Sequence, residues 1–184
     1  MDDQDRRAFL RLLSEIVPMY ELRLFSYCLM ENHFHLFLQT KKPNLSEAMH
    51  DLQGQYAQYL NRRYDRVGYL FQNRYKSPLV NEEQYALALT RYIHRNPLEA
   101  GLVKKLEDYQ WSSYPSYIGI LPAWKWLETH WLLRQFHENP ETAVQVFRFF
   151  HQMEPPQAEQ GKIQKMRPLL GDLAPSTPKG ARPL

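Results

Sequence analysis

The strongest constraint on the fold is a pair of apolar segments separated by two polar residues. The first segment, ELRLFSYCLM, covers residues 21–30, and the second, HFHLFLQT, covers residues 33–40. Both are rich in aromatic and aliphatic residues, and a short polar link between two such segments is typical of a tight turn. The sequence therefore predicts a β-hairpin that turns at Glu31 and Asn32, and with it an antiparallel sheet.

Three helices are predicted around this hairpin. Apolar residues recur at helical spacing in three segments, which are residues 2–17, 44–68 and 81–96. Because proline disfavours helical backbone in the residue before it, we expect Pro18 to end the first helix and Pro97 the third. The second should begin at a cap formed by Asn44 or Ser46 and end at Gly68.

The order of these segments predicts an α+β fold. Residues 69–80 are typical of a short irregular strand pair, so the expected order is α-β-β-α-β-α. This order favours helices on one face of an antiparallel sheet. Residues 121–154 have the apolar spacing of a helical extension. Residues 155–184 are rich in proline and glycine and poor in aromatics, so we expect a disordered tail.

Composition narrows the cellular setting. The net charge of +3 and a pI near 8.9 lean towards an anionic partner. Cys28, the one cysteine, lies in an apolar run and is expected to be a buried, reduced thiol. No stretch approaches the roughly 20 apolar residues of a membrane span, and the charged start of the chain lacks a signal peptide's apolar segment. We therefore expect a soluble cytoplasmic protein without a membrane partner.

Two histidines alternate with apolar residues in the second predicted strand. Alternate residues of a strand share a face, so His33 and His35 point one way while Phe34 and Leu36 point to the core. The two imidazoles are about 7 Å apart along the strand, which lets their ring nitrogens converge on one cation. Two unrelated histidines on a half-exposed face are the alternative.

The third predicted helix carries a tyrosine and an asparagine on one face. Tyr92 and Asn96 are four residues apart, so a helix stacks them. An amide oxygen is a hard ligand suited to magnesium or manganese, and a tyrosine one turn away can attack a phosphate. Alternatively, Tyr85, Leu89 and Tyr92 form an ordinary apolar stripe and Asn96 caps the helix.

A basic and aromatic stretch, YLNRRYDRVGYLFQNRYK, covers residues 59–76. Guanidinium groups can hold phosphates, and aromatic rings can stack on unpaired bases. A solvated helix end with core tyrosines is the alternative. The candidate DNA-binding residues are Arg62, Arg63, Arg66, Arg74, Lys76, Tyr69 and Phe71.

Four blocks in order resemble the hallmark motifs of the REP-associated tyrosine transposases, relatives of the single-tyrosine HUH (IS200-like) transposases of insertion sequences. The blocks are YCLMENHFHLFLQT, GYLFQNRYKSPLV, RYIHRNPLEAGLV and YQWSSYPSYIG. The resemblance covers roughly residues 5–120, so we expect a transposase-like domain over residues 1–120. It implies a ferredoxin-like sheet.

By this resemblance, His33, His35 and Asn96 match the metal ligands and Tyr92 matches the nucleophile. It implies Mg²⁺ or Mn²⁺ as cofactor and hairpin-forming single-stranded DNA, of the palindromic repeat type, as substrate. Family members cut that DNA through a 5′-phosphotyrosine intermediate and leave a 3′-hydroxyl. A nucleoid-associated cytoplasmic protein, monomer or homodimer, is expected.

Two departures from the family pattern keep alternatives open. Glu31 stands where the family usually has proline, and the family's first β-strand has no counterpart before residues 2–17. Either the start lies upstream, or another chain fills the slot, or this is a catalytically inactive remnant that still binds hairpin DNA. A small metal-dependent hydrolase unrelated to DNA is a third hypothesis, which the basic and aromatic stretch disfavours.

Overall fold

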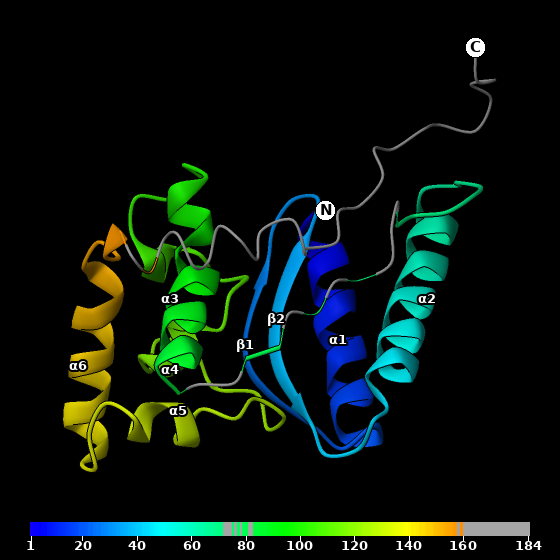
Figure 1. The fold of residues 1–184 in the computed structure, drawn as a ribbon. Helices are drawn as coiled ribbons and strands as arrows, with labels where there is room; N and C mark the ends of the chain where they lie inside the picture. The colour runs from blue at the N-terminus through cyan, green and yellow to red at the C-terminus, as the bar shows by residue number, and fades with distance from the viewer. Residues whose placement is uncertain (72–74, 76, 78, 81–82, 158, 160–184) are drawn as a thin grey trace.

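The computed structural model describes residues 1–71, 75, 77, 79–80, 83–157 and 159. None of the helices in this described part is long and apolar enough to cross a membrane. In chain order the elements are α1 (Asp3–Met19), β1 (Leu22–Leu29), β2 (Phe34–Thr40), α2 (Leu45–Arg63), α3 (Glu83–Glu99), a 3₁₀ turn (Leu106–Asp108), α4 (Tyr114–Tyr117), α5 (His130–Arg134) and α6 (Pro140–Gln152) (Figure 1).

The predicted hairpin is confirmed. β1 and β2 pair antiparallel, with Leu22 opposite Thr40 at the open end and Leu29 opposite Phe34 next to the turn. The Met30 amide donates to the His33 carbonyl at 2.9 Å and closes the turn. The register therefore places His35 directly opposite Cys28 of β1, in the buried part of the sheet.

Helices cover both faces of this hairpin. On one face, the Phe9 ring of α1 lies 4.7 Å from the Phe34 ring and 4.9 Å from the Tyr56 ring of α2. On the other, the His35 ring lies 5.6 Å from the Tyr92 ring of α3. Neighbouring strand residues point to opposite faces, so α1 and α2 lie across the sheet from α3, as Figure 1 shows. The predicted α+β fold with an antiparallel sheet is confirmed, but the helices lie on both faces and not on one, because α3 covers the second face.

The outer edge of β1 is covered by chain that follows α3. The Leu29 amide donates to the Trp111 carbonyl at 2.9 Å, and the Ser113 amide donates to the Tyr27 carbonyl at 3.0 Å. Further along, the Glu128 amide donates to the Leu24 carbonyl at 2.8 Å. Pairing the edge satisfies backbone groups that would otherwise be open to another strand. Residues beyond 110 thus form backbone hydrogen bonds with the edge of the sheet.

Two predicted helix ends were wrong because proline is tolerated in a last turn. α1 includes Pro18, and the Tyr20 amide still donates to the Ile16 carbonyl at 3.0 Å. α3 includes Pro97, and the Ala100 amide donates to the Asn96 carbonyl at 2.9 Å. Proline lacks an amide donor and crowds the carbonyl four residues before it, but the amides that follow it can still donate, so the helix continues past both prolines. Asn96 consequently lies inside the helix rather than at its end.

The other predicted boundaries differ in smaller ways. α2 begins after Asn44, as predicted, but ends at Arg63, because Asp65 adopts a positive φ of 48°. Residues 121–129 are not helical, so the predicted helical extension over 121–154 is confirmed only for α5 and α6. Of the predicted strand pair of residues 69–80, residues 72–74, 76 and 78 lie outside the described residues, and the described ones belong to no strand. Most of the predicted tail also lies outside the described residues. The domain boundaries stay predictions.

Candidate active site

The two histidines of the second strand converge through their ring nitrogens. His33 Nε2 lies 3.1 Å from His35 Nε2. His33 Nδ1 lies 2.8 Å from the Asn32 side-chain oxygen, which can only accept, so Nδ1 carries the proton. The lone pair of His33 Nε2 therefore faces His35. His35 is buried, with 1% of its surface exposed, whereas His33 is half-buried.

This pair fits a divalent cation. Two nitrogens that each lie about 2.1 Å from one ion, at a right angle, are roughly 3.0 Å apart. The observed separation of 3.1 Å between His33 Nε2 and His35 Nε2 is close to that value. Within the described residues no three His, Cys, Asp or Glu side chains gather at one point. A third ligand drawn from the described residues would therefore be of another type, such as an amide oxygen.

α3 brings the tyrosine and the asparagine to the same side of the sheet. The Tyr92 ring stands edge-on to the His35 ring, and Tyr92 is half-buried. The Asn96 side-chain nitrogen donates to the Tyr92 carbonyl at 2.7 Å. Because this bond uses the nitrogen, the Asn96 oxygen is the atom that remains for a ligand. His35 thus lies on β2 and His33 directly before it, whereas Tyr92 and Asn96 lie on α3. The observed contacts join His33 to His35, His35 to Tyr92, and Tyr92 to Asn96.

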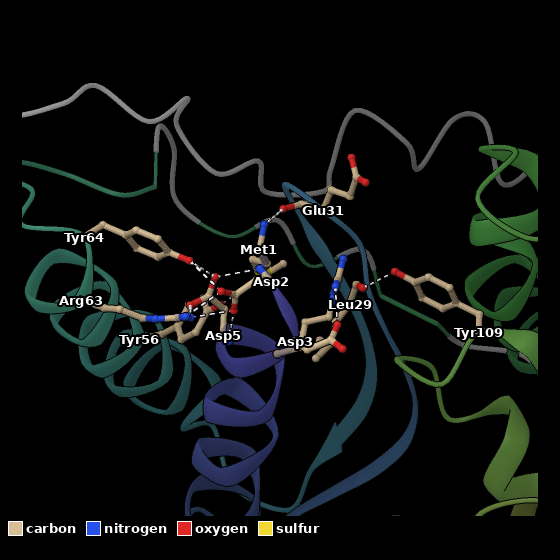
Figure 2. A network of polar contacts seen from close by, with 11 residues as sticks. Met1, Asp2, Asp3, Asp5, Leu29, Glu31, Tyr56, Arg63, Tyr64 and Tyr109 are labelled. Carbon is tan, nitrogen blue, oxygen red and sulfur yellow. Dashed lines mark hydrogen bonds and ion pairs between the residues drawn. The ribbon is translucent and has the colours of Figure 1, made fainter.

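Arg63, predicted to bind DNA, has a structural role. Its guanidinium donates to both carboxylate oxygens of Asp2 at 2.6 Å and to Asp5, and the Tyr64 hydroxyl donates to Asp5 at 2.8 Å (Figure 2). The hydrogen bond from Arg63 holds the pKa of the Asp2 carboxyl well below its usual value. Asp5 is buried, so this network fastens the end of α2 to the start of α1. The predicted phosphate contact of Arg63 competes with these carboxylates.

The other predicted DNA-binding residues are distributed around the end of α2. Arg62 is exposed, Arg66 is half-buried, and Tyr69 has 96% of its surface exposed. Phe71 instead packs towards the core, with its ring 6.2 Å from the Phe34 ring. Arg74 and Lys76 lie outside the described residues. The exposed Tyr69 and Arg62 are accessible to nucleic acid, whereas Phe71 has a packing role.

Comparison with known proteins identifies the family. The family described as "Transposase IS200 like" matches residues 1–96, a range that includes both histidines, Tyr92 and Asn96. The chain belongs to the IS200-like transposase family. No curated protein and no solved structure gives a significant match. Membership confirms the resemblance inferred from the sequence motifs and supports an enzyme that cuts DNA during transposition.

Sequence reasoning missed one residue of this site and one face of α3. Asn32 looked like an ordinary turn residue, although its position directly before His-x-His was a usable signal. Arg91, His94 and Arg95 are all buried on α3. Their spacing of three and four residues marks a second helix face, but nothing in the sequence indicated what that face contacts.

Proposed function

We propose that this transposase cuts and rejoins single-stranded hairpin DNA with Tyr92 as the nucleophile. The observation that carries the proposal is the convergence of His33 Nε2 and His35 Nε2 beside the Tyr92 ring. Two imidazole nitrogens at ligand spacing next to a phenol are the groups that metal-assisted attack on a phosphodiester requires. The family match over residues 1–96 supports DNA as the substrate.

His33, His35 and Asn96 would hold Mg²⁺ or Mn²⁺. When bound, the ion would supply Lewis-acid polarisation of the scissile phosphate. Asn32 fixes the tautomer of His33 by accepting its Nδ1 proton, so that Nε2 keeps its lone pair for a ligand bond. The buried position of His35 restricts the movement of its ring.

Tyr92 performs the covalent step. Its phenolic oxygen gives up its proton to solvent or a nearby base and attacks the phosphorus. A bond forms between that oxygen and phosphorus, the bond from phosphorus to the 3′-oxygen breaks, and the 3′-oxygen takes up a proton. The products are a 5′-phosphotyrosine and a 3′-hydroxyl. Attack by a 3′-hydroxyl on the phosphotyrosine reverses the step, so no external energy source is needed for rejoining.

The surface at the end of α2 supports binding of the DNA. Arg62 and Arg66 offer positive charge, and the exposed ring of Tyr69 offers a platform for an unpaired base. Arg74 and Lys76 lie outside the described residues, and their contact with DNA stays a prediction from the sequence.

Replacement of the nucleophile tests the proposal. Tyr92→Phe removes only the hydroxyl, so we expect loss of the covalent protein–DNA adduct and unchanged DNA affinity. The measurement is a denaturing gel of protein incubated with labelled hairpin DNA and Mn²⁺. Tyr85→Phe, on the same helix, is the matched control and should keep the adduct. An adduct in Tyr92→Phe places the nucleophile elsewhere, and DNA binding without any adduct in the wild type identifies a non-catalytic DNA-binding protein.

A further inference from the structure

The face of α3 that carries Arg91, His94 and Arg95 is buried against α6 and the segment around Ser113. His94 and His151 of α6 have 1% and 0% of their surface exposed, and Ser113 has 0%. Neither histidine can reach DNA from such positions. All four ring nitrogens of these two histidines nevertheless lie at hydrogen-bonding distance from another polar atom, as expected for buried polar groups that stabilise a fold.

A continuous chain of hydrogen bonds crosses this interface. The Tyr27 amide of β1 donates to Ser113 Oγ at 3.0 Å. Ser113 Oγ lies 2.7 Å from His94 Nε2, and His94 Nδ1 lies 3.1 Å from His151 Nε2. His151 Nδ1 lies 2.9 Å from the Phe147 carbonyl. β1, α3 and α6 are therefore joined through two imidazoles and the hydroxyl of Ser113, the residue before α4 (Tyr114–Tyr117).

The two ends of the chain fix the direction of every bond. The Phe147 carbonyl can only accept, so His151 Nδ1 carries a proton and, in the neutral ring, Nε2 accepts from His94 Nδ1. His94 Nε2 then accepts from the Ser113 hydroxyl, whose oxygen accepts from the Tyr27 amide. With both histidines neutral, every ring nitrogen and the hydroxyl have a partner, and the Ser113 hydroxyl also lies 3.3 Å from the Tyr27 carbonyl, a second acceptor. The chain of bonds therefore ties α3 to β1 and to α6.

This chain links the nucleophile to the histidine hairpin. Tyr92 and His94 lie on the same turn of α3, and Tyr27 is the neighbour of Cys28, which pairs with His35. The Ser113 amide also donates to the Tyr27 carbonyl at 3.0 Å, so Ser113 is fixed to β1 by two bonds. The position of α3 relative to His35 therefore depends on His94.

The arginines beside His94 strengthen the same contact. Arg91 donates to the Phe150 carbonyl at 3.2 Å and forms an ion pair with Glu159. Arg95 donates to the His151 carbonyl at 3.0 Å. Cations at the C-terminal end of a helix complement its dipole and its unpaired carbonyls. α6 is thereby held against α3 along its last turn.

We propose that His94 and Ser113 are positioning residues for Tyr92, and that residues 111–151, which lie beyond the family match, form part of the active unit. The proposal rests on the proposed function of Tyr92. The His94–Ser113 bond sets the distance between the nucleophile helix and the strand that carries His35. α6 contacts the opposite nitrogen of His94 through His151. The C-terminal segment thus fixes the position of the nucleophile helix without contacting the active site itself.

Three variants test this role. His94→Leu removes both ring bonds, Ser113→Ala removes one hydroxyl and is the milder change, and His94→Gln restores one polar group. Misplacing a reacting group by about 1 Å costs about 10²-fold in rate. We therefore expect His94→Leu to slow adduct formation by about 10²-fold, Ser113→Ala to slow it less, and His94→Gln to recover part of the rate. DNA affinity should be unchanged in all three.

A matched control separates positioning from general stability. Tyr56→Phe removes a buried hydroxyl that contacts Met1 Sδ at 2.9 Å, in the α1–α2 layer across the sheet. It should lower the melting temperature without slowing the adduct step in single-turnover assays well below that temperature. Wild-type adduct rates in folded His94→Leu and Ser113→Ala would overturn the positioning role. Absence of an adduct in the wild type overturns the proposed function instead.

A spectroscopic measurement on the unaltered protein tests the hydrogen-bond chain directly. Nitrogen-15 NMR distinguishes the two neutral tautomers of histidine. The chain requires the proton on Nδ1 in both His94 and His151, at neutral pH and without DNA or metal. A proton on Nε2 of either ring breaks the chain and overturns the proposal, whether or not the protein cuts DNA.

Discussion

At the scale of single residues, the site depends on which imidazole nitrogens carry a proton and which keep a lone pair. Asn32 takes the Nδ1 proton of His33 and leaves Nε2 facing His35 Nε2. The lone pair of His33 Nε2 either accepts a proton from His35 Nε2 or, with His35 in its other tautomer, faces a cation that both nitrogens bind. The 3.1 Å separation suits both arrangements, so the pair can serve as two ligands of one metal ion.

Removal of either histidine should therefore abolish tight metal binding. We expect His33→Ala and His35→Ala each to weaken Mn²⁺ binding by more than 10-fold, and Asn32→Ala, which acts through His33, by about 10-fold. Calorimetric titration measures these affinities. His50→Ala, an exposed histidine on α2, is the control and should bind Mn²⁺ as the wild type does. Full affinity in both strand variants would mean that the ion binds elsewhere.

The residue scale also shows where sequence reasoning stops. The spacing of His33 and His35 was sufficient to predict that their rings share a face, because a strand has a fixed period of two. The role of Arg63 was not predictable, because its partners Asp2 and Asp5 lie about 60 residues earlier in the chain. Local patterns indicate the spacing and polarity of side chains, but they do not indicate which charged residue far away in the sequence a side chain will contact.

At the scale of elements, Arg63 joins α2 to α1, and this gives a direct test of structural against DNA-binding roles. Arg63→Ala leaves the buried Asp5 carboxylate without its guanidinium partner, so we expect a clear fall in melting temperature. Arg62→Ala, next to it and exposed, should leave the melting temperature unchanged and weaken DNA binding instead. The reverse pattern would make Arg63 the phosphate contact.

The buried histidines of α3 and α6 should make stability sensitive to acid. Burial lowers the pKa of His94 well below its usual value and that of His151 to about 3, with Arg91 and Arg95 adding to the shift of His151. A depressed histidine pKa contributes stability that is present above the unfolded pKa of about 6.5 and is lost as pH falls from there towards the folded pKa. Each histidine can contribute a slope of up to about 1.4 kcal/mol per pH unit in that window.

Chemical denaturation at a series of pH values measures this slope. The wild type should lose stability steeply below about pH 6, and His151→Leu should lose it less steeply because one titrating group is gone. His130→Leu replaces a histidine outside the chain of hydrogen bonds and should keep the wild-type slope. Equal slopes in the wild type and in His151→Leu would show that His151 is already protonated in the folded protein.

At the scale of the whole molecule, the family match ends at residue 96 but the structure does not divide there. Trp111 and Ser113 pair with β1, and α6 packs on α3 through His151. The sequence motifs predicted the hairpin, the helices and the family, because each can be inferred from residues that are close together in the sequence. The motif YQWSSYPSYIG also marked residues 109–119 as part of the domain. The packing of α6 on α3, by contrast, is a tertiary property and has no local signature.

The DNA surface is the remaining whole-molecule property, and its salt dependence tests it. Binding to single-stranded DNA weakens with salt by a slope of about −0.7 per neutralised phosphate in log affinity against log salt. If Arg62, Arg66 and Arg74 each hold a phosphate, the triple alanine variant should flatten the slope by about 2. Fluorescence anisotropy with labelled hairpin DNA over a range of salt concentrations measures this slope.

The control variant removes the same charge at three exposed lysines away from α2, which are Lys104, Lys105 and Lys125. Equal flattening of the slope in both variants would reflect net charge alone, whereas flattening confined to the arginine variant shows that these arginines contact the DNA backbone.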